Sequence, residues 1–242
     1  SMNALLLAAG HGKRLRPITD QMPKCLVPIL NKPLLGFWLD LLEKSEKIEN
    51  IFINTHYLVN QVEDFIKKYK SKKKINLVYE PVLLGTAGTL KNISKSLTQE
   101  SLFVAHADNL SLFDIEEFIN VFETRPEFAE ITMMTFTTDN PKSCGIIKKN
   151  CDGIVHEFYE KKTKFYGTEA NGAVFIFSKN SLQSLLQFKN CFDISKDILP
   201  EFLGKISTYK NNTYHRDIGT LESYTKANEE FLSVYETWQK KI

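Results

Sequence analysis

From Asn3 to Asn109 the chain alternates short apolar runs with segments of helical periodicity, and few folds accommodate this pattern. The apolar runs are Asn3–Ala9, Ile51–Asn54, Ile75–Tyr79 and Leu102–Ala105. Helical spacing appears after Pro33, around Val62 and over Thr86–Leu97. Strands that alternate with helices form a parallel, doubly wound sheet through right-handed crossovers. We therefore predict an α/β fold with a mostly parallel sheet, whose ligands bind beyond the carboxyl ends of the strands.

The rest of the chain is less regular and is richer in predicted strands. Alternating or apolar patterns predict strands over Ile131–Thr137, Cys144–Lys148, Ile154–Tyr159 and Ala173–Phe177, the middle two joined by a turn at residues 150–153. Helical patterns cover Ile194–Leu203 and Leu221–Trp238. Because no linker, repeat or low-complexity segment interrupts the sequence, we predict a single domain over residues 3–240.

Composition limits the possible partners. Lys and Arg number 31 and Asp and Glu 29, so the net charge is +2, too small to favour nucleic-acid binding. No apolar run reaches the ~18–20 residues of a membrane helix. The four cysteines lack the spacing of a metal site, which fits reduced thiols. We expect a soluble, cytoplasmic protein without nucleic-acid or membrane partners, and we leave its oligomeric state open.

A glycine-rich, basic loop follows the first predicted strand. Gly10 and Gly12 let backbone N–H groups approach an anion, and Lys13, Arg14, Arg16 and Lys24 add four cations. Arginine offers a bidentate fork to phosphate oxygens and lysine a point charge. This combination favours phosphate binding over a mobile basic loop.

Three further segments are ambiguous when taken alone. Glu80–Thr89 follows a strand and contains small residues against which a flat ring could lie, or it is a loop capped by Thr86. Asp108 and Asp217 are either turn or cap residues or a pair that holds Mg²⁺, which takes one or two carboxylates plus substrate phosphates. Residues 160–162 and 171–172 are either a charged hairpin end or a pocket for hydroxyls and phosphate.

Taken in order, these motifs match a known family. They read LAAG-x-G-x-R-L-x-P with a downstream PK, then LGTAG, a strand-end Asp, EK, NG and DIGT. The chain resembles the nucleotidyltransferases that make sugar nucleotides from a sugar 1-phosphate and an NTP. The resemblance implies a Rossmann-like fold with a nucleotide-binding half over residues 3–125, an interleaved sugar-binding β region over 126–220, and Mg²⁺ as cofactor.

The resemblance also implies roles for individual residues. Arg14, Lys24 and Asp108 are the expected catalytic residues, and Asp108 and Asp217 the expected metal ligands. The expected nucleotide-binding residues are Leu7, Ala8, Ala9, Gly10, Gly12, Lys13, Glu80, Gly85, Thr86 and Ala87. The expected substrate-binding residues are Asn109, Gly145, Glu160, Lys161, Asn171 and Gly172. Two positions depart from the family pattern, with Lys13 in place of Thr or Ser and Lys162 in place of Pro.

The implied reaction is in-line attack by the sugar phosphate on the α-phosphorus of the NTP, with release of pyrophosphate. LGTAG favours guanylyl transfer; uridylyl or cytidylyl transfer, to another sugar 1-phosphate or to a phosphate such as phosphocholine, is the alternative. A nicotinamide-dependent Rossmann enzyme would need a third glycine near Leu15 and an acidic residue ending the second strand. An inactive relative would have lost Arg14, Lys24 or an aspartate. No appended acetyltransferase or regulatory module is expected.

Overall fold

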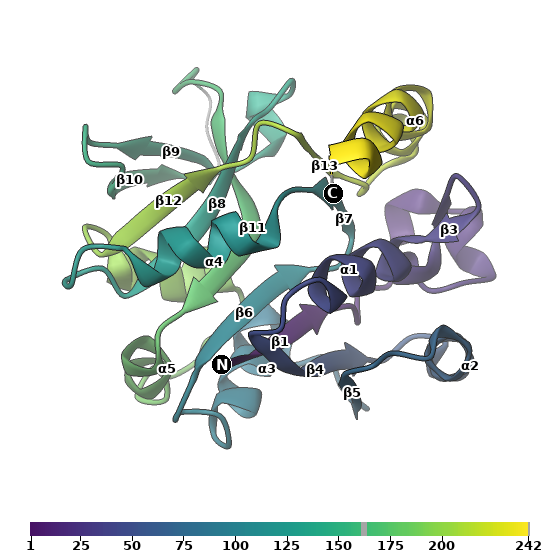
Figure 1. The fold of residues 1–242 in the computed structure, drawn as a ribbon, viewed down its shortest axis with the longest axis horizontal. Helices are drawn as coiled ribbons and strands as arrows, with labels where there is room; N and C mark the ends of the chain where they lie inside the picture. Colours follow the sequence, from purple (N-terminus) through teal and green to yellow (C-terminus); the bar gives the residue numbers. More distant parts are fainter. Residues whose placement is uncertain (161–163, 242) are drawn as a thin grey trace. The chain divides into compact units, whose positions relative to one another are not determined.

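A computed structural model of the protein describes residues 1–160 and 164–241 (Figure 1). The chain folds into two compact units, each made of three separate segments. Unit 1 comprises residues 1–3, 84–105 and 116–212, and unit 2 comprises residues 4–83, 106–115 and 213–242. The predicted α/β class is confirmed, and the strands form mixed sheets rather than a purely parallel one.

Unit 2 contains the first alternating strands and helices. Its main strands are β1 (Met2–Leu7), β4 (Ile48–Thr55) and β5 (Lys74–Tyr79), in that spatial order, and β4 and β5 run parallel. Helix α1 (Leu34–Glu43) precedes β4, and α2 (Val59–Tyr69) connects β4 to β5. Two small antiparallel ribbons join β2 (Pro28–Ile29) to β3 (Lys32–Pro33) and β7 (Asn109–Leu112) to β13 (Tyr214–Asp217). Helix α6 (Leu221–Lys241) ends the chain beside β13 (Figure 1).

Helix α1 is shorter than its apolar pattern suggests. Eight of its residues between Leu34 and Leu42 are buried, so the helix is apolar on almost every side. Pro33 adopts an extended conformation and precedes the first turn rather than occupying it. Ile48 continues the helical spacing in the sequence, yet a turn at Ser45 ends the helix and Ile48 opens β4.

Unit 1 is built around antiparallel strands. Strand β11 (Glu169–Phe177) pairs with β6 (Ser101–His106) on one side and β8 (Ile131–Thr137) on the other, and β8 pairs in parallel with β12 (Ile206–Lys210). The predicted hairpin is present as β9 (Ile146–Lys149) and β10 (Val155–Tyr159). The helices of this unit are α3 (Gly85–Ser94), α4 (Ile115–Glu123, from Glu116 onward) and α5 (Lys179–Leu185). Phe118 on α4 packs against Phe103 of β6 and Tyr209 of β12, so α4 covers one face of these strands (Figure 1).

The helix expected over Ile194–Leu203 takes a different form. Residues Ile194–Ile198 form a π-helix and Leu199–Phe202 a 3-10 helix. Pro200 lies at the start of the second piece, where its missing N–H could not have continued an α-helical bonding pattern. The sequence analysis also did not identify β2, β3, β7, α4, α5, β12 and β13, most of which are short.

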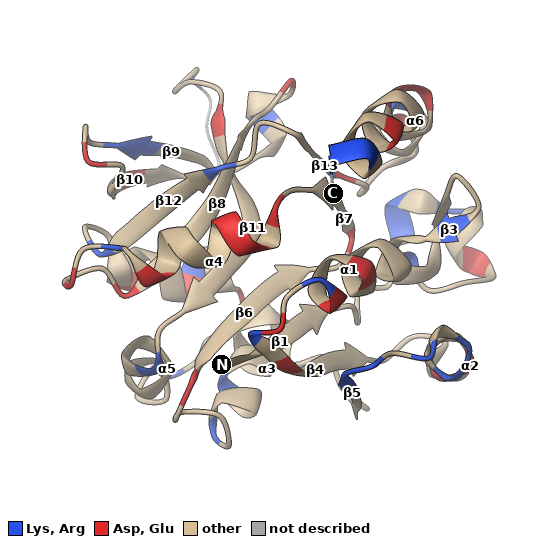
Figure 2. Ribbon diagram, in the orientation of Figure 1, with Lys and Arg blue, Asp and Glu red and all other residues tan. Residues whose placement is uncertain are grey.

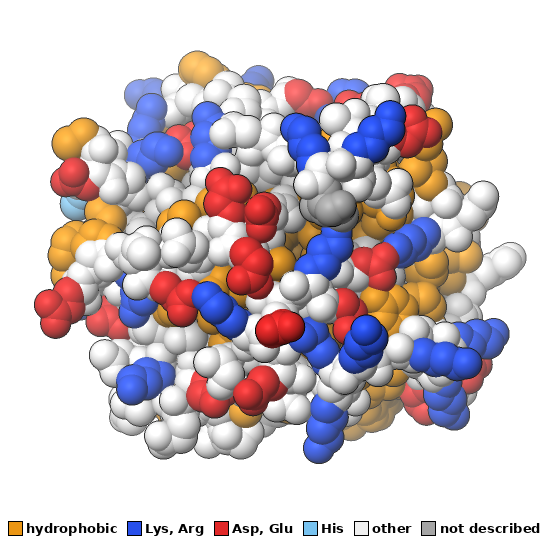
Figure 3. All heavy atoms as spheres, in the orientation of Figure 1, with side chains coloured by type: hydrophobic (Ala, Val, Ile, Leu, Met, Phe, Trp, Pro, Cys, Tyr) orange, Lys and Arg blue, Asp and Glu red, His pale blue; other side chains and the backbone are white. Residues whose placement is uncertain are grey.

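Charges are spread over the molecule. Lysines gather at the end of α2 and the start of β5, where the sequence reads KKYKSKKK (Figure 2). Elsewhere on the face shown in Figure 3 acidic and basic side chains are interspersed. None of the described helices combines the length and the apolar character that a bilayer span requires.

Aromatic side chains pack helix α6 against the rest of unit 2. Phe231 is fully buried and meets Phe37 of α1 edge-on, with ring centroids 5.3 Å apart. Tyr235 stacks on Phe231 at the same centroid separation. Leu221, which opens the helical pattern in the sequence, is 42% exposed. The buried face therefore begins further along the helix, at Tyr224 and Ala227.

Replacing Phe231 by alanine should lower the free energy of unfolding by about 3–5 kcal/mol, because the truncation leaves a cavity among buried side chains. Chemical denaturation measures the change. The matched control is Leu232→Ala at the neighbouring position, where the side chain is 50% exposed; its effect should stay below about 0.5 kcal/mol. Equal losses in the two variants would contradict the assigned core.

Candidate active site

The basic loop after β1 is folded into three short 3-10 turns in unit 2. Gly12 adopts a left-handed conformation with φ 72°, and a Cβ there would lie 2.9 Å from Thr19 Cγ2 and 3.0 Å from Lys24 Cβ. Only glycine fits this position without displacing the loop. At Gly10 a Cβ would meet no atom within 4 Å, so the backbone there faces open space that a ligand could use.

Side chains close this loop on itself. Thr19 donates from Oγ1 to the carbonyl of Gly12 at 2.5 Å, and Tyr57 donates from its hydroxyl to the carbonyl of Thr19 at 2.8 Å. The ring of Tyr57 also stacks on His11, with centroids 4.0 Å apart. Tyr57 lies just before α2, so one residue of the β4–α2 connection holds the loop at both His11 and Thr19.

A cluster of two cations and two carboxylates lies next to the loop. Lys24, only 8% exposed, forms an ion pair with Asp108, with 2.7 Å between Nζ and Oδ2. Burial alone would lower the pKa of Lys24, but Asp108 and Asp217 outweigh that effect and raise it. Lys24 is therefore a fixed positive charge at neutral pH.

Strand pairing brings the two aspartates together from distant parts of the sequence. Strand β13 pairs with β7 so that Asp217 lies opposite Asn109, and the Ile218 N–H donates to the Asp108 carbonyl at 3.1 Å. Burial would raise the pKa of Asp108, but Lys24 and His106 hold it below its usual value. Although Asp217 is exposed, desolvation of its carboxyl by surrounding protein atoms and the negative charge of Asp108 raise its pKa to about 6.

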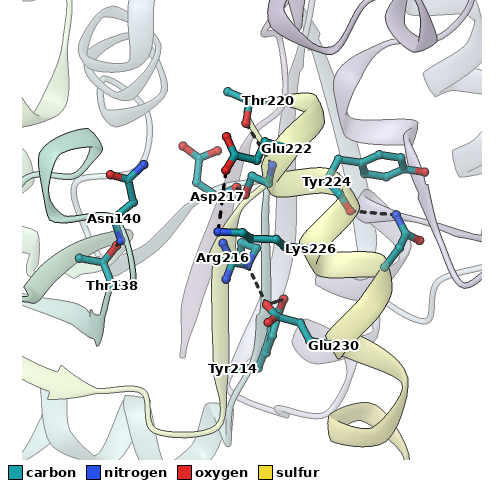
Figure 4. A network of polar contacts seen from close by, with 12 residues as sticks. Thr138, Asn140, Tyr214, Arg216, Asp217, Thr220, Glu222, Tyr224, Lys226 and Glu230 are labelled. Atoms are coloured by element: carbon teal, nitrogen blue, oxygen red, sulfur yellow. Dashed lines mark hydrogen bonds and ion pairs between the residues drawn. The ribbon is translucent and has the colours of Figure 1, made fainter.

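Gly219 lies between one cation and one carboxylate of the cluster. A Cβ at this position would be 3.0 Å from Asp217 Oδ1 and 3.1 Å from Arg14 Nη2. The absence of a side chain lets these two groups approach each other. Beyond it, Thr220 accepts from the Ser223 N–H and caps α6, with Glu222 in the first turn. On the same ribbon and helix, Glu230 binds both Arg216 and Tyr214 (Figure 4).

A second polar network links the ends of β1, β4 and β5. Asn54 accepts from the Ala8 N–H at 2.7 Å and donates to Glu80 Oε2 at 3.2 Å. Glu80 is 3% exposed, and its carbonyl lies 2.7 Å from His56 Nδ1. The Leu7 carbonyl accepts from the Ala107 N–H at 3.0 Å. These bonds fix the backbone at Leu7 and Ala8 and the carboxylate of Glu80.

The LGTAG segment lies in unit 1 and begins α3. Gly85 has φ 77°, and a Cβ there would lie 2.2 Å from the Phe192 carbonyl oxygen, so a side chain is excluded. The Ala87 N–H donates to that same carbonyl at 3.0 Å. Thr86 does not cap the helix; its Oγ1 accepts from the Ile194 N–H at 3.0 Å.

Gly145, Glu160 and Asn171 lie close together in unit 1. A Cβ on Gly145 would be 2.7 Å from Glu160 Oε1, and the Gly145 carbonyl accepts from the Asn171 N–H at 2.9 Å. Gly172 follows Asn171 in β11, where the pairing with β8 shifts register between Asn171 and Phe175. Lys161 and Lys162 lie outside the described residues.

Two other expected residues have contrasting environments. Asn109 in unit 2 is 6% exposed; its carbonyl accepts from Trp38 Nε1 at 2.8 Å and its amide donates to the His106 carbonyl at 3.3 Å. Lys13 opens the first 3-10 turn and is exposed.

Within the described part of the chain, no three or more His, Cys, Asp and Glu side chains gather in a way that could hold a metal ion.

Comparison with known proteins assigns the family. A family model described as nucleotidyl transferase matches residues 3–234. The chain belongs to this family. The resemblance inferred from the motifs is thereby confirmed, as is the Rossmann-like α/β class, which solved nucleotidyltransferase structures share.

Three relatives illustrate the similarity of this chain to known proteins. A D-glycero-α-D-manno-heptose 1-phosphate guanylyltransferase of Aneurinibacillus thermoaerophilus is 30% identical over 95% of this chain and 98% of its own length. The catalytic subunit beta of a Danio rerio mannose-1-phosphate guanylyltransferase is 29% identical, and the chain spans only 61% of its length. HddC from Yersinia pseudotuberculosis, in its structure complexed with GMP-PN, has 25% sequence identity to this chain. The two structures superpose with a TM-score of 0.76, covering 95% of this chain and 99% of that one.

The motif analysis missed several residues that shape these sites. Asn54 is the last residue of a predicted strand, so the rule that ligand sites lie at strand ends could have identified it. Gly219 stands within the DIGT motif, but only its contacts reveal why glycine is needed. Tyr57 and Thr19 act through hydrogen bonds to loop carbonyls and carry no motif signal.

Exchanging Asn54 for aspartate should destabilise the protein, and more so at higher pH. The new carboxylate would face Glu80, and one of the two would acquire a raised pKa. A group with a raised pKa in the folded state gives stability at low pH that is lost as the pH rises through that pKa. The difference in unfolding free energy from the wild type should therefore grow between pH 5 and pH 8. Denaturation at several pH values measures it, and Asn190→Asp at an exposed position is the control; parallel profiles would contradict the network.

Proposed function

We propose that this chain transfers GMP from GTP to a sugar 1-phosphate, releasing pyrophosphate and forming a GDP-sugar. The observation that carries the proposal is the cluster of Arg14, Lys24, Asp108 and Asp217 beside the glycine loop of unit 2. Family membership and the two guanylyltransferase relatives support the reaction class and the choice of GTP. Uridylyl or cytidylyl transfer to another phosphate is the alternative.

Unit 2 would bind the triphosphate. The backbone around Gly10 faces open space, and Lys24 and Arg14 supply positive charge at the loop. The attacking oxygen of a sugar phosphate is already anionic, so the reaction needs no general base. The barrier lies in bringing two anions together and in stabilising the departing pyrophosphate, which positioning and electrostatics achieve.

The residues present fit a divalent cation. Desolvation, and after it the negative charge of Asp108, raises the pKa of Asp217, and a cation bound by both carboxylates would offset the repulsion between them. Asp108 and Asp217 would hold Mg²⁺, with substrate phosphate oxygens completing its coordination. When bound, Mg²⁺ supplies positive charge that neutralises the phosphates. Lys24 keeps Asp108 ionised and oriented.

Unit 1 would hold the acceptor. Gly145, Glu160 and Asn171 combine a space without a side chain, a carboxylate and an amide, which are suitable partners for sugar hydroxyls and phosphate. Lys161 would add a phosphate-binding charge. A cytoplasmic location belongs to this proposal as an expectation, and whether the chain forms a homo-oligomer stays open; neither is needed for the chemistry.

The test is a pyrophosphate-release screen of GTP, ATP, UTP, CTP and dTTP against a panel of sugar 1-phosphates and phosphocholine, with Mg²⁺. GTP with a sugar 1-phosphate should give the highest kcat/KM. A preference for UTP or CTP would support the alternative, and no release with any pair would refute the enzyme assignment.

Replacing Lys24 by alanine should leave the protein folded and lower kcat by about 10²–10³-fold, the typical effect of losing one preorganised charge contact. Pyrophosphate release at saturating substrates measures the loss. The matched control is Lys70→Ala after α2, where the side chain is distant in sequence from every motif. A Lys24→Ala enzyme that turned over at the wild-type rate would contradict the role of Lys24.

Glu80 should select guanine. The N1–H and N2–H₂ groups of guanine are adjacent donors that match the two oxygens of a carboxylate, whereas hypoxanthine lacks the second donor. Wild-type enzyme should therefore use GTP about 10-fold better than ITP, and Glu80→Gln should reduce that ratio to near one. Ratios of kcat/KM measure the effect, with Glu49→Gln at an exposed site as control. An unchanged ratio would place base recognition elsewhere.

A further inference from the structure

A segment without any recognised motif contacts two of the predicted binding segments in unit 1. Within residues 191–198, the Phe192 carbonyl accepts from the Ala87 N–H, and the Ile194 N–H donates to Thr86 Oγ1, both at 3.0 Å. Ser195 Oγ lies 3.3 Å from Asn171 Nδ2 and accepts its hydrogen bond. The same short segment therefore touches the LGTAG loop and the asparagine of the predicted acceptor pocket.

The segment is held in one conformation by its own hydrogen bonds. Asp197 accepts from the Phe192 and Asp193 N–H groups, each at 2.8 Å, and these backbone bonds lower its pKa. Asp193 accepts from the Lys196 N–H at 3.0 Å. Ile194 and Ile198 of the π-helix are fully buried, and their side chains anchor the segment in the core of unit 1. Ser195 thus projects from a fixed backbone.

The orientation of the Asn171 amide follows from its two hydrogen bonds. Its Oδ1 accepts from the Ala173 N–H at 2.8 Å. Because a backbone N–H can only donate, the amide atom that faces Ala173 must be the oxygen. Ala173 has φ 56° in the left-handed region, a conformation that this side-chain bond supports. The nitrogen then points to Ser195. With its oxygen engaged, Asn171 meets a ligand as a hydrogen-bond donor, so its partner must be an oxygen acceptor.

We infer that Ser195 is a positioning residue that fixes the Asn171 amide for donation to an oxygen of the sugar phosphate. This inference rests on the proposed function, in which Asn171 belongs to the acceptor pocket. Without the serine hydroxyl, the amide keeps only its bond from Ala173, and its nitrogen loses the partner that sets its direction. The consequence should fall on the acceptor and leave the nucleotide unaffected.

The first test is a comparison of Michaelis constants. Ser195→Ala should raise the KM for the sugar phosphate about fivefold, the factor expected for one neutral hydrogen bond, and leave the KM for the NTP within about twofold. Ser195→Thr retains the hydroxyl and should restore the wild-type value. Ser184→Ala, at an exposed position of α5, is the control. Equal changes in both KM values, no change, or failure of the threonine variant would overturn the inference.

A double-mutant cycle separates positioning from general destabilisation. If Ser195 acts through Asn171, then Ser195→Ala should have no further effect on the acceptor KM in an Asn171→Ala background. Additive losses would overturn the inference. Melting temperatures of the four proteins verify that each is folded at the assay temperature.

Binding distinguishes this inference from the proposed function. Calorimetry would measure the Kd of the sugar 1-phosphate for wild-type and Ser195→Ala proteins without turnover. Weaker binding in the variant, with no pyrophosphate release by the wild type, would uphold the inference and refute the function. Wild-type turnover with equal Kd values would uphold the function and refute the inference. Neither binding nor turnover would refute both.

Discussion

The ion pair between Lys24 and Asp108 organises the candidate active site. A buried lysine is stable as a cation only beside compensating negative charge, and Asp108 and Asp217 supply it. In turn Lys24 keeps Asp108 ionised, while desolvation and the charge of Asp108 raise the pKa of Asp217. The cluster therefore combines cations suited to anionic ligands with two carboxylates that, in the proposed function, would hold a divalent cation. Its geometry depends on the β7–β13 ribbon, which brings residue 217 next to residue 108.

The two units contribute different kinds of site. In unit 2 the glycine loop and Glu80 follow the strands β1 and β5, as expected for a parallel sheet, whereas Asp217 lies on the antiparallel β7–β13 ribbon. In unit 1 they depend on irregular backbone: the left-handed Gly85, the register shift after Asn171 and the left-handed Ala173. Such features place side chains that regular strand geometry would not bring together.

Most of the main strands, and the motifs that follow them, could be predicted from the sequence. Strand β8 has the predicted bounds, and β1, β4, β5 and β6 lie within a few residues of theirs, because buried strands have a clear apolar signal. The π-helix at 194–198 could not be predicted, since its sequence has ordinary helical spacing and its form depends on Asp197 and on the LGTAG loop. Short ribbons such as β7–β13 leave little periodicity to detect. The motifs located Asp108 and Asp217, but the Asn54 and Ser195 contacts depend on tertiary structure.

The single hydrogen of Gly219 has a consequence for sequence variation. A methyl group there would press on Arg14 and on Asp217 at once, so it could be accommodated only if one of them moved or became smaller. Positions 14 and 219 lie far apart in the chain but share this space. In homologous proteins a larger residue at 219 should therefore occur together with a compensating replacement at 14.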